Sequence, residues 1–579
     1  MRLVFDRCLD FLEARRIEDV VPLVKAAEAA AREGRWGALA LAYESAPAFD
    51  EACCVHPQTG GLPLAVLAVF DQPGRSSNDE QTRRKKGRYR AGKWTPLITD
   101  DDYGRALEAI HRYIVAGDTY QINFTYPLQC RFDGDSDAWF GDLCRAQGYG
   151  YFARLDLGEW QVLSLSPELF FSRSGDRIKA RPMKGTAARG RWLEEDRRRM
   201  EQLTVSAKDR AENVMIVDLM RNDLGRIARS GSVHVTRLFD VERYPTVFQM
   251  TSTVEAELRA GVSLMDCLMA LFPCGSITGA PKVRSMQIIR ELEKSPRGFY
   301  TGAVGLLKPG GDVVLNVAIR TVTIHVPSGR AVFGVGGGIT HDSLTAGERE
   351  ECRHKTVFLA PRPDFQLIET LLLERGEWFL LDRHLRRMRD SAEFFDFKWS
   401  EDSVCRALET AAGAAGPGTW RVRLTLDRDG RVTVERQPFS AEQKAVWRVA
   451  VAPEAVNTRD VFLYHKTTVR EVYERARSAR PDCDDVILWN ERGELTESTI
   501  ANIVVERNGR RFTPARDCGL LAGTFRASLL ESGEVEEAVL SREDLQQADA
   551  LYLVNSVRKW MRASLIGPLP SIANTPSGR

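Results

Sequence analysis

The stretches that decide the fold of this 579-residue chain are KDRAENVMIVDLMRNDLGRI (Lys208–Ile227) and LFPCGSITGAPK (Leu271–Lys282). The first has helical periodicity and places Asp209 and Glu212 three residues apart, on one face of a helix. The second is a loop of small residues that runs into a helix predicted over 283–292. Such a loop exposes backbone N–H groups at a helix N-terminus, which favours a bound carboxylate or phosphate.

A second acid pair has the same spacing as the first. Glu348 and Glu351 lie three residues apart in GEREECRHK, which also has helical character. Two helices that each offer an acid pair could enclose a hard cation such as Mg²⁺, which prefers oxygen ligands completed by substrate and water. Each pair alone is better explained as a solvated helix face with salt bridges to Arg210 or Lys355, so the pairs do not decide for a metal.

The composition describes a folded chain with balanced charge. Lys plus Arg number 81 and Asp plus Glu 80, so the net charge is 81 − 80 = +1, and 43% of residues are hydrophobic. These values exclude a globally basic nucleic-acid coat and a disordered chain. The eleven cysteines form no CxxC pair, no apolar run is long enough to cross a bilayer, and the N-terminus is unlike a signal peptide. We therefore expect a cytoplasmic enzyme with no nucleic-acid and no membrane partner.

The order of hairpin and helix patterns predicts an α+β chain with antiparallel sheets. Pairs of strand-like segments flank turn signals such as Ser174–Asp176 and Asn508–Gly509, which excludes a Rossmann fold. The two prolines in Ala360–Asp364 indicate a linker. The basic stretch 72–94 is interpreted as a solvated surface loop. The predicted organisation is 1–95 (N-terminal part of the first module), 96–359 (its catalytic part), 360–364 (linker) and 365–579 (second module).

Seven motifs of the first half resemble the chorismate-utilising enzymes in order and spacing, over roughly 91–359. They are SPELF (166–170), RPMKGT (181–186), AENVMIVDLMRNDLGRI (211–227), FPCGSITGAPK (272–282), AIRT (318–321), GGGI (336–339) and the EREE helix. The resemblance implies a two-lobed α/β sandwich with a magnesium ion that holds a carboxylate of chorismate. It implies Glu212 and Glu351 as metal ligands with Asp209 and Glu348 in the outer shell. The implied substrate contacts are Thr278, Gly279, Arg320, Gly336, Gly337 and Lys355.

Two positions indicate which branch of that family the chain resembles. Relatives that add water carry a lysine where this chain has Gln121, so ammonia is the expected nucleophile. Anthranilate synthases usually carry alanine where this chain has Lys184, and lysine there resembles the aminodeoxychorismate synthases. The neutral amine of Lys184 would attack ring carbon C2 while the C4 hydroxyl leaves, and ammonia would then attack C4 and expel the lysine. Glu168 would protonate the leaving hydroxyl, which requires a raised pKa.

Two features of the first half depart from what such an enzyme needs. Relatives often carry histidine where this chain has Gln249, and that histidine helps at the C4 hydroxyl. The chain also lacks a recognisable glutaminase, because no cysteine lies in a glycine-flanked nucleophile elbow. Ammonia would therefore come from a separate glutamine amidotransferase subunit or from free ammonium.

Five segments of the second half resemble the fold-type IV pyridoxal-phosphate enzymes, which include aminotransferases and aminodeoxychorismate lyase. They begin at Phe365, Leu463, Glu494, Leu520 and Ala550, and the resemblance spans roughly 365–561. It implies pyridoxal phosphate as cofactor, with a site made of Lys466 (Schiff-base lysine), Glu497 (pyridinium partner), Arg387, Gly523 and Thr524 (phosphate) and Ser556 near the phosphate. Relatives carry a further segment before the first of these motifs, so part of the cofactor wall is missing here or is supplied by the first half.

The two resemblances together predict a bifunctional enzyme that makes 4-aminobenzoate for folate. The first module would aminate chorismate to 4-amino-4-deoxychorismate, and the second would eliminate pyruvate from it. Two alternatives stay open: a synthase fused to a separate branched-chain or D-amino acid aminotransferase, and an anthranilate synthase component with a noncatalytic second module. A homodimer through the second module is a further expectation.

Overall fold

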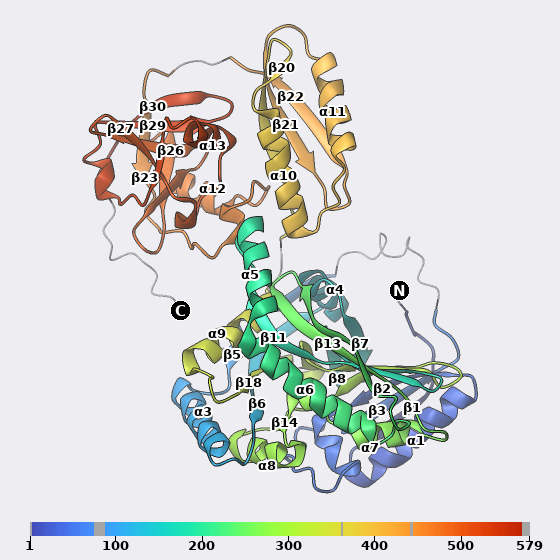
Figure 1. Ribbon diagram of the computed structural model, residues 1–579. Helices are drawn as coiled ribbons and strands as arrows, with labels where there is room; N and C mark the ends of the chain where they lie inside the picture. Colours follow the sequence, from blue (N-terminus) through green and yellow to red (C-terminus); the bar gives the residue numbers. More distant parts are fainter. Residues whose placement is uncertain (1–2, 75–86, 361–362, 441–443, 570–579) are drawn as a thin grey trace. The chain divides into compact units, whose positions relative to one another are not determined.

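The computed structural model describes residues 3–74, 87–360, 363–440 and 444–569. Two compact units are present: Met1–Arg189 with Arg199–Arg362, and Gly190–Arg198 with Pro363–Arg579. Figure 1 shows both units with their elements labelled. Parts of the predicted basic loop (75–86) and of the predicted linker (361–362) lie outside the described residues.

The first unit contains a ten-stranded sheet in which every pairing is antiparallel. Its order is β1-β3-β2-β15-β16-β9-β10-β13-β11, and β12 pairs with β13. The N-terminal strands therefore continue the sheet that carries the predicted catalytic motifs. The strands are β1 (Cys8–Ala14), β2 (Trp36–Leu41), β3 (Ala65–Phe70), β9 (Leu169–Ser174), β10 (Arg177–Arg181), β11 (Met183–Ala188), β12 (His234–Arg243), β13 (Val247–Glu257), β15 (Ala303–Leu307) and β16 (Val313–Val317).

A second, eight-stranded antiparallel sheet completes the first unit. Its order is β14-β6-β18-β17-β8-β7, and β4 and β5 pair with β6. The two sheets share a buried apolar cluster that includes Val66, Val162 and Val304, so they pack as a sandwich. The strands are β4 (Tyr89–Ala91), β5 (Thr95–Pro96), β6 (Gln121–Gly134), β7 (Tyr151–Asp156), β8 (Trp160–Ser166), β14 (Gly279–Ala280), β17 (Thr321–His325) and β18 (Arg330–Ile339).

Helices cover the outer faces of both sheets. In the largest core cluster, α1, α6 and α7 bury their apolar faces against the ten-stranded sheet, and Figure 1 shows these three helices together. The side chain of Ser206 accepts a hydrogen bond from Asp209 N–H, so it caps α6 and fixes where that helix begins. The helices are α1 (Ile17–Arg32), α3 (Asp100–Val115), α4 (Ser136–Gln147), α6 (Ala207–Gly225), α7 (Leu264–Leu271), α8 (Lys282–Leu292) and α9 (Thr345–Thr356). Helix α5 (Leu193–Val205) begins among residues of the second unit.

The apolar pattern of residues 313–325 predicts one continuous strand that carries Arg320, and this prediction is wrong. The segment forms two strands, β16 and β17, which belong to different sheets. Arg320 lies between them with a φ of 52°, in the left-handed region. This turn moves the chain from one sheet to the other and places Arg320 at the crossover.

The second unit contains a four-stranded antiparallel sheet and an eight-stranded mixed sheet. The first, in the order β20-β19-β21-β22, has strands β19 (Leu367–Glu374), β20 (Glu377–Trp378), β21 (Thr419–Leu426) and β22 (Val432–Pro438). The second, in the order β25-β24-β23-β30-β29-β26-β27-β28, has strands β23 (Trp447–Val451), β24 (Asp485–Trp489), β25 (Leu495–Ser498), β26 (Asn502–Arg507), β27 (Arg510–Pro514), β28 (Glu536–Ala538), β29 (Ala550–Asn555) and β30 (Lys559–Leu565). The helices are α10 (Leu381–Phe395), α11 (Glu401–Gly413), α12 (Glu471–Ala479) and α13 (Thr524–Glu531). The predicted α+β class with antiparallel sheets is confirmed.

The sequence pattern predicts a helix over 467–478, and this prediction starts the helix too early. The structure begins α12 at Glu471, because the preceding residues bond to β19 instead. Thr468 N–H donates to the carbonyl of Gln366 at 3.0 Å, and Ile368 N–H donates to the carbonyl of Lys466 at 3.0 Å. Lys466 therefore lies in a loop held against a strand.

Candidate active sites

One cavity of about 140 Å³ in the first unit gathers most of the predicted site residues. It lies between β11, α6, β18 and α9. The predicted residues that line it are Glu168, Lys184, Asp209, Glu212, Arg320, Gly336, Glu348, Glu351 and Lys355, together with Gln249.

Lysines and a serine hold the carboxylates of this cavity. Lys184 Nζ lies 3.4 Å from Glu212 Oε2, and Lys355 Nζ lies 2.6 Å from Glu351 Oε1. Burial and the nearby charge of Glu351 raise the pKa of Glu348, whose carboxylate accepts a hydrogen bond from a serine hydroxyl. Burial acts to raise the pKa of Glu351, but the charge of Lys355 outweighs it and the pKa is lowered. Glu348 and Glu351 thus face one cavity with opposite shifts of their pKa.

The carboxylate oxygens of this cavity are of the chemical type that a hard divalent cation binds. Four carboxylates from two helices line the same cavity, and Mg²⁺ prefers such oxygen ligands. Across the described parts of the chain, no group of three or more His, Cys, Asp or Glu side chains stands close enough to hold an ion without rearrangement. Glu212 and Glu351 now pair with lysines, so a cation there would compete with Lys184 and Lys355.

Glu168 has the environment that a general acid needs. Its side chain is 2% exposed, and burial raises its pKa to about 7 against the opposing hydrogen bonds. Ser276 Oγ–H donates to Glu168 Oε1 at 2.7 Å, and Met183 N–H donates to the same oxygen at 3.4 Å. The acid is therefore anchored beside β11, the strand that carries Lys184.

Lys184 lies at an irregularity of β11. Met183 pairs with Thr251 of β13, but the register shifts before the next pair, Thr186 with Gln249. Gln249 Nε2 donates to the carbonyl of Gly185 at 3.0 Å, and the hydroxyl of Thr186 donates to Gln249 Oε1 at 3.1 Å. Gln249 thus braces the bulged strand instead of supplying an imidazole.

A partner of Lys184 was not predicted from the sequence. Asn213 Nδ2 donates to the carbonyl of Lys184 at 3.0 Å, and the hydroxyl of Ser252 donates to Asn213 Oδ1. Asn213 follows Glu212 on α6, so one helix turn contacts both the backbone and the amine of Lys184. The sequence could have indicated Asn213, because it follows the predicted metal ligand Glu212 in a segment expected to pack on the sheet.

Four predicted substrate residues do not line the cavity: Gln121, Thr278, Gly279 and Gly337. Thr278 is fully buried and its hydroxyl donates to Cys274 O at 3.1 Å, so in this structure it shapes the loop. Gln121 is also buried, and neither polar atom of its side chain has a hydrogen-bond partner in the described residues. A Cβ at Gly338 would lie 2.0 Å from Lys184 Nζ and 2.9 Å from Gln121 Nε2. Glycine there leaves room for both side chains.

Arg320 is available as a carboxylate clamp at the cavity wall. Burial lowers its pKa to about 10, and its guanidinium lies over the Phe358 ring at 5.1 Å. It also donates to the carbonyl of Lys355. A buried guanidinium that uses only some of its N–H donors within the protein can bind an anionic group of a ligand with the others.

In the second unit, Lys466 lies among charged groups from three other segments. Burial, followed by the positive charge of Arg387, lowers the pKa of Lys466 to about 8. Glu369, Arg470 and Glu497 also act on it electrostatically. Within the described residues, Lys466 Nζ makes no hydrogen bond and no ion pair, so this amine is available for a ligand.

Glu497 is a buried carboxyl with protein donors on both oxygens. Burial raises its pKa to about 7. Tyr473 O–H donates to Oε1 at 2.8 Å and Asn502 Nδ2 donates to Oε2 at 3.2 Å. A Cβ at Gly523 would lie 2.0 Å from Asn502 Oδ1, so only glycine fits where α13 begins.

A buried triad that the sequence did not reveal orients Arg387. Glu369 accepts from Arg387 Nε at 2.8 Å and from His384 Nδ1 at 2.6 Å. Burial lowers the pKa of His384, so the ring is neutral and its Nε2 accepts from the Thr524 hydroxyl at 3.2 Å. The signal was a glutamate inside the apolar strand Leu367–Glu374, since a buried carboxylate needs cationic partners. Ser556 Oγ donates to the carbonyl of Thr370 at 3.4 Å, on the same strand.

These residues fit pyridoxal phosphate. A free buried amine (Lys466), a carboxyl of raised pKa (Glu497) and an arginine beside a helix N-terminus (Arg387 with Thr524) supply what its aldehyde, ring nitrogen and phosphate require.

The family assignment follows from residues 26–361, which match the family model described as chorismate binding enzyme. The chain belongs to this family. Residues 366–566 match a second model, described as amino-transferase class IV. Both resemblances inferred from the motifs are thereby confirmed.

Relatives of this chorismate binding enzyme carry two kinds of name. Aminodeoxychorismate synthase component 1 of Klebsiella aerogenes is 44% identical over 259 residues, which cover 45% of this chain and 57% of the relative. Anthranilate synthase component 1 of Aquifex aeolicus is 40% identical over 263 residues, which cover 45% of this chain and 53% of the relative. The chain spans little more than half the length of these curated relatives.

A solved structure supports the fold of the first unit. Anthranilate synthase component I from Streptococcus pneumoniae aligns with a TM-score of 0.55 and 24% identity, over 62% of this chain and 92% of that one.

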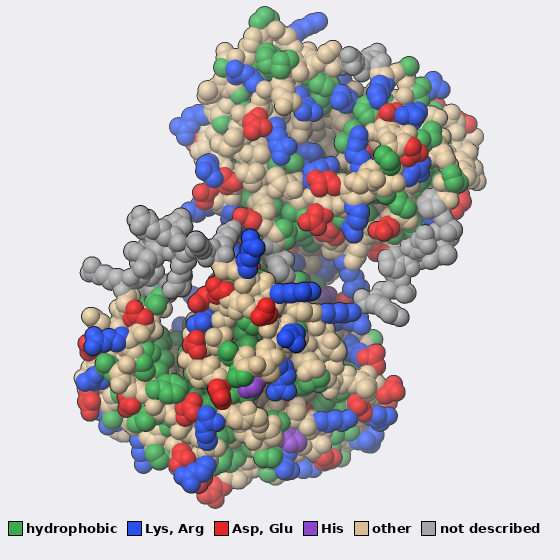
Figure 2. All heavy atoms as spheres, turned by 180° about the vertical axis from the view of Figure 1, so that it is seen from behind, with side chains coloured by type: hydrophobic (Ala, Val, Ile, Leu, Met, Phe, Trp, Pro, Cys, Tyr) green, Lys and Arg blue, Asp and Glu red, His purple; other side chains and the backbone are tan. Residues whose placement is uncertain are grey.

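On the face drawn in Figure 2, basic and acidic side chains are intermingled, in keeping with the net charge of +1. Among the described helices, none combines the length and the apolar character needed to cross a membrane.

Proposed function

We propose that this chain makes 4-aminobenzoate in two steps. The first unit replaces the C4 hydroxyl of chorismate with ammonia, and the second eliminates pyruvate from the product. The observation that carries the proposal is Lys184 in the same cavity as Glu168. A nucleophilic amine beside a buried acid of raised pKa suits a covalent substitution.

The amination proceeds by two displacements on the chorismate ring. The neutral amine of Lys184 bonds to C2 while the C4–O bond breaks, and Glu168 gives the leaving hydroxyl a proton to form water. Ammonia then bonds to C4, the C2–N bond to Lys184 breaks, and the surplus proton of the ammonium returns to a base. Arg320 and Lys355 hold the substrate carboxylates.

Magnesium would be held by Glu212 and Glu351, with Asp209 and Glu348 outside them. When bound it supplies a positive charge for a substrate carboxylate. We expect a chelator to abolish amination. Glu351→Gln should raise the magnesium concentration needed for the half-maximal rate by about ten- to a hundredfold. Glu350→Gln, on the same helix but outside the cavity, should leave that concentration unchanged, and an unchanged value for Glu351→Gln would contradict its role.

The proton that Glu168 donates makes amination dependent on pH. Because its pKa is about 7 and it acts in its protonated form, the rate should fall as pH rises through about 7. Glu168→Gln should lower the rate by about 10²- to 10⁴-fold and remove this dependence. Steady-state rates measured across pH test both points, with Glu159→Gln on the surface as the control. A wild-type rate that rises through pH 7 would argue against a general acid here.

In the second unit, Lys466 acts as the base and Glu497 as the partner of the cofactor ring. When bound, pyridoxal phosphate supplies an electron sink for the substrate's C4 amine. Lys466 takes the proton from C4, and the bond between the ring and the enolpyruvyl oxygen breaks as the ring becomes aromatic. The released enolpyruvate takes up a proton to become pyruvate. A pKa of about 8 leaves a usable fraction of Lys466 neutral at neutral pH.

The source of ammonia is proposed to be a separate glutamine amidotransferase subunit, as the words "component 1" in the relatives' names support.

The class IV match also favours a second candidate function, in which the second unit transfers amino groups. Product analysis with chorismate, ammonium, magnesium and pyridoxal phosphate separates these. Accumulation of 4-amino-4-deoxychorismate without 4-aminobenzoate would reject the lyase, and anthranilate as product would reject the assignment of Lys184.

A further inference from the structure

Residues 190–198 belong to the second unit, although in sequence they lie between β11 and α6 of the first. Trp192 is 7% exposed and is part of the main core cluster of the second unit. The centroid of its ring lies 5.2 Å from that of Tyr464. The guanidinium of Arg516 also lies over the indole, 4.5 Å from its centroid. The indole is therefore a buried anchor in a unit whose other residues begin at Pro363.

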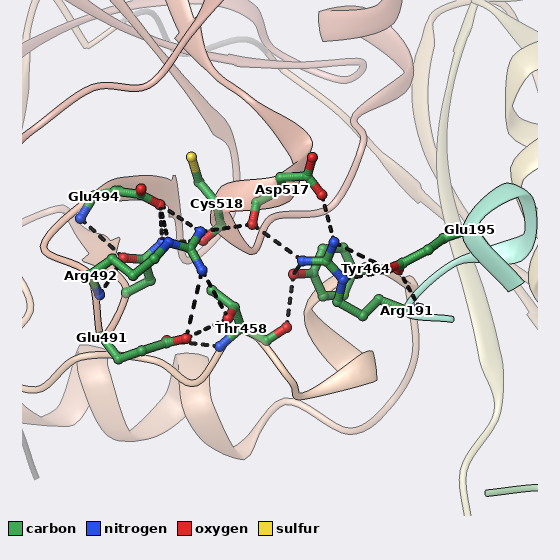
Figure 3. Close-up of polar contacts among 10 residues, drawn as sticks. Arg191, Glu195, Thr458, Tyr464, Glu491, Arg492, Glu494, Asp517 and Cys518 are labelled. Atoms are coloured by element: carbon green, nitrogen blue, oxygen red, sulfur yellow. Dashed lines mark hydrogen bonds and ion pairs between the residues drawn. The ribbon is translucent and has the colours of Figure 1, made fainter. Parts of the chain in front are cut away.

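Arg191 adds a polar network to this anchor, which Figure 3 shows. Its Nη2 donates to Asp517 Oδ1 at 2.6 Å, and its Nη1 donates to the Tyr464 hydroxyl at 3.1 Å. Its Nε donates to Glu195 Oε2 at 2.9 Å, which fixes the guanidinium from its own side. Tyr464 O–H in turn donates to the carbonyl of Thr458 at 2.9 Å. The segment thus ties down both ends of the loop 458–464.

The backbone of Arg191 also reaches the residue before Lys466. His465 Nε2 lies 3.1 Å from the Arg191 carbonyl, and its Nδ1 lies 2.9 Å from Ser391 Oγ. A carbonyl can only accept, so Nε2 carries the proton and Nδ1 accepts from the serine hydroxyl. The ring packs against Phe394, at a centroid distance of 4.5 Å. Three contacts therefore fix the orientation of His465.

We propose that Gly190–Arg198 completes the cofactor unit, with Arg191 and Trp192 as positioning residues for Lys466. Strand β19 holds the backbone of Lys466 from one side, through the bond from Ile368 N–H. The 190–198 segment holds the preceding residues from the other side. The inference rests on the proposed use of pyridoxal phosphate by this unit.

The test uses the full-length chain with Arg191→Ala, Trp192→Ala and the control Arg198→Ala, an exposed residue of the same segment. Because a shift of Lys466 misplaces the reacting amine, we expect the first two to weaken pyridoxal phosphate binding at least about tenfold. The pH midpoint of the visible absorbance of the bound cofactor should shift as well, while the control should match the wild type. Unchanged affinity and midpoint in both variants would overturn the proposal.

Amide hydrogen exchange of the cofactor-free proteins provides a readout that does not depend on the cofactor. Exchange should rise in 458–467 in both variants and stay unchanged in the central strands β26 and β29. A rise throughout the second unit would mean general destabilisation and would also overturn the positioning role. If the wild type binds no pyridoxal phosphate, the proposed function fails, and exchange in 458–467 alone decides whether the segment holds the Lys466 loop.

Discussion

Replacing Lys184 with methionine is expected to lower the rate of chorismate amination by about 10³-fold or more, as removal of a covalent nucleophile does. Methionine keeps the length and much of the volume of the side chain but cannot bond to C2. The rate is measured with ammonium as nitrogen source, so that no amidotransferase subunit enters the result. Pyridoxal phosphate binding by the second unit should be unchanged.

A second variant separates nucleophilic attack from the effect of charge. Arginine at position 184 keeps a cation beside Glu212, which lies 3.4 Å from the lysine amine, but it is not a nucleophile. Lys184→Arg should therefore be as inactive as the methionine variant. Recovery of activity with arginine would mean that the residue acts by its charge, and the covalent route would be wrong. Lys179→Met, a lysine near half exposure on β10, serves as the matched control.

Regular elements of this fold were predictable where local chemistry determines them. The turn at Ser174–Asp176 and the turn at Asn508–Gly509 lie between paired strands as expected, because their residues tolerate the required backbone. The break at Arg320 was not predictable, because an arginine with a φ of 52° sits between two apolar, strand-like segments. Only the presence of two sheets makes that conformation necessary.

In the candidate sites too, some features could be predicted from local sequence and others depend on tertiary packing. The acid pairs of α6 and α9 face one cavity because helical spacing sets their direction. Glu369 stood in the sequence as a charge in an apolar strand, but its partners depend on how α10 packs on β19. The contacts of 190–198 had no signal, since Arg191 and Tyr464 are 273 positions apart.

Replacing Lys466 with alanine is expected to remove the visible absorbance of bound pyridoxal phosphate and to stop formation of 4-aminobenzoate. The described charged groups that act on Lys466 include no second amine, and the two cations, Arg387 and Arg470, cannot serve as nucleophiles or bases. Amination should continue, so 4-amino-4-deoxychorismate should accumulate in proportion to chorismate consumed. Absorbance and product are both measured on the full-length chain, with Lys444→Ala on the surface as the control.

The two lysine variants can also be mixed, because each keeps the site that the other lacks. The Lys184→Met chain retains Lys466, and the Lys466→Ala chain retains Lys184. If 4-amino-4-deoxychorismate leaves one protein and reaches the other, the mixture forms 4-aminobenzoate although neither variant does so alone. Persistence of the visible absorbance in Lys466→Ala would contradict the cofactor assignment. Formation of 4-aminobenzoate by Lys466→Ala alone would contradict the role of the lysine as base, because another group would then have removed the proton from C4.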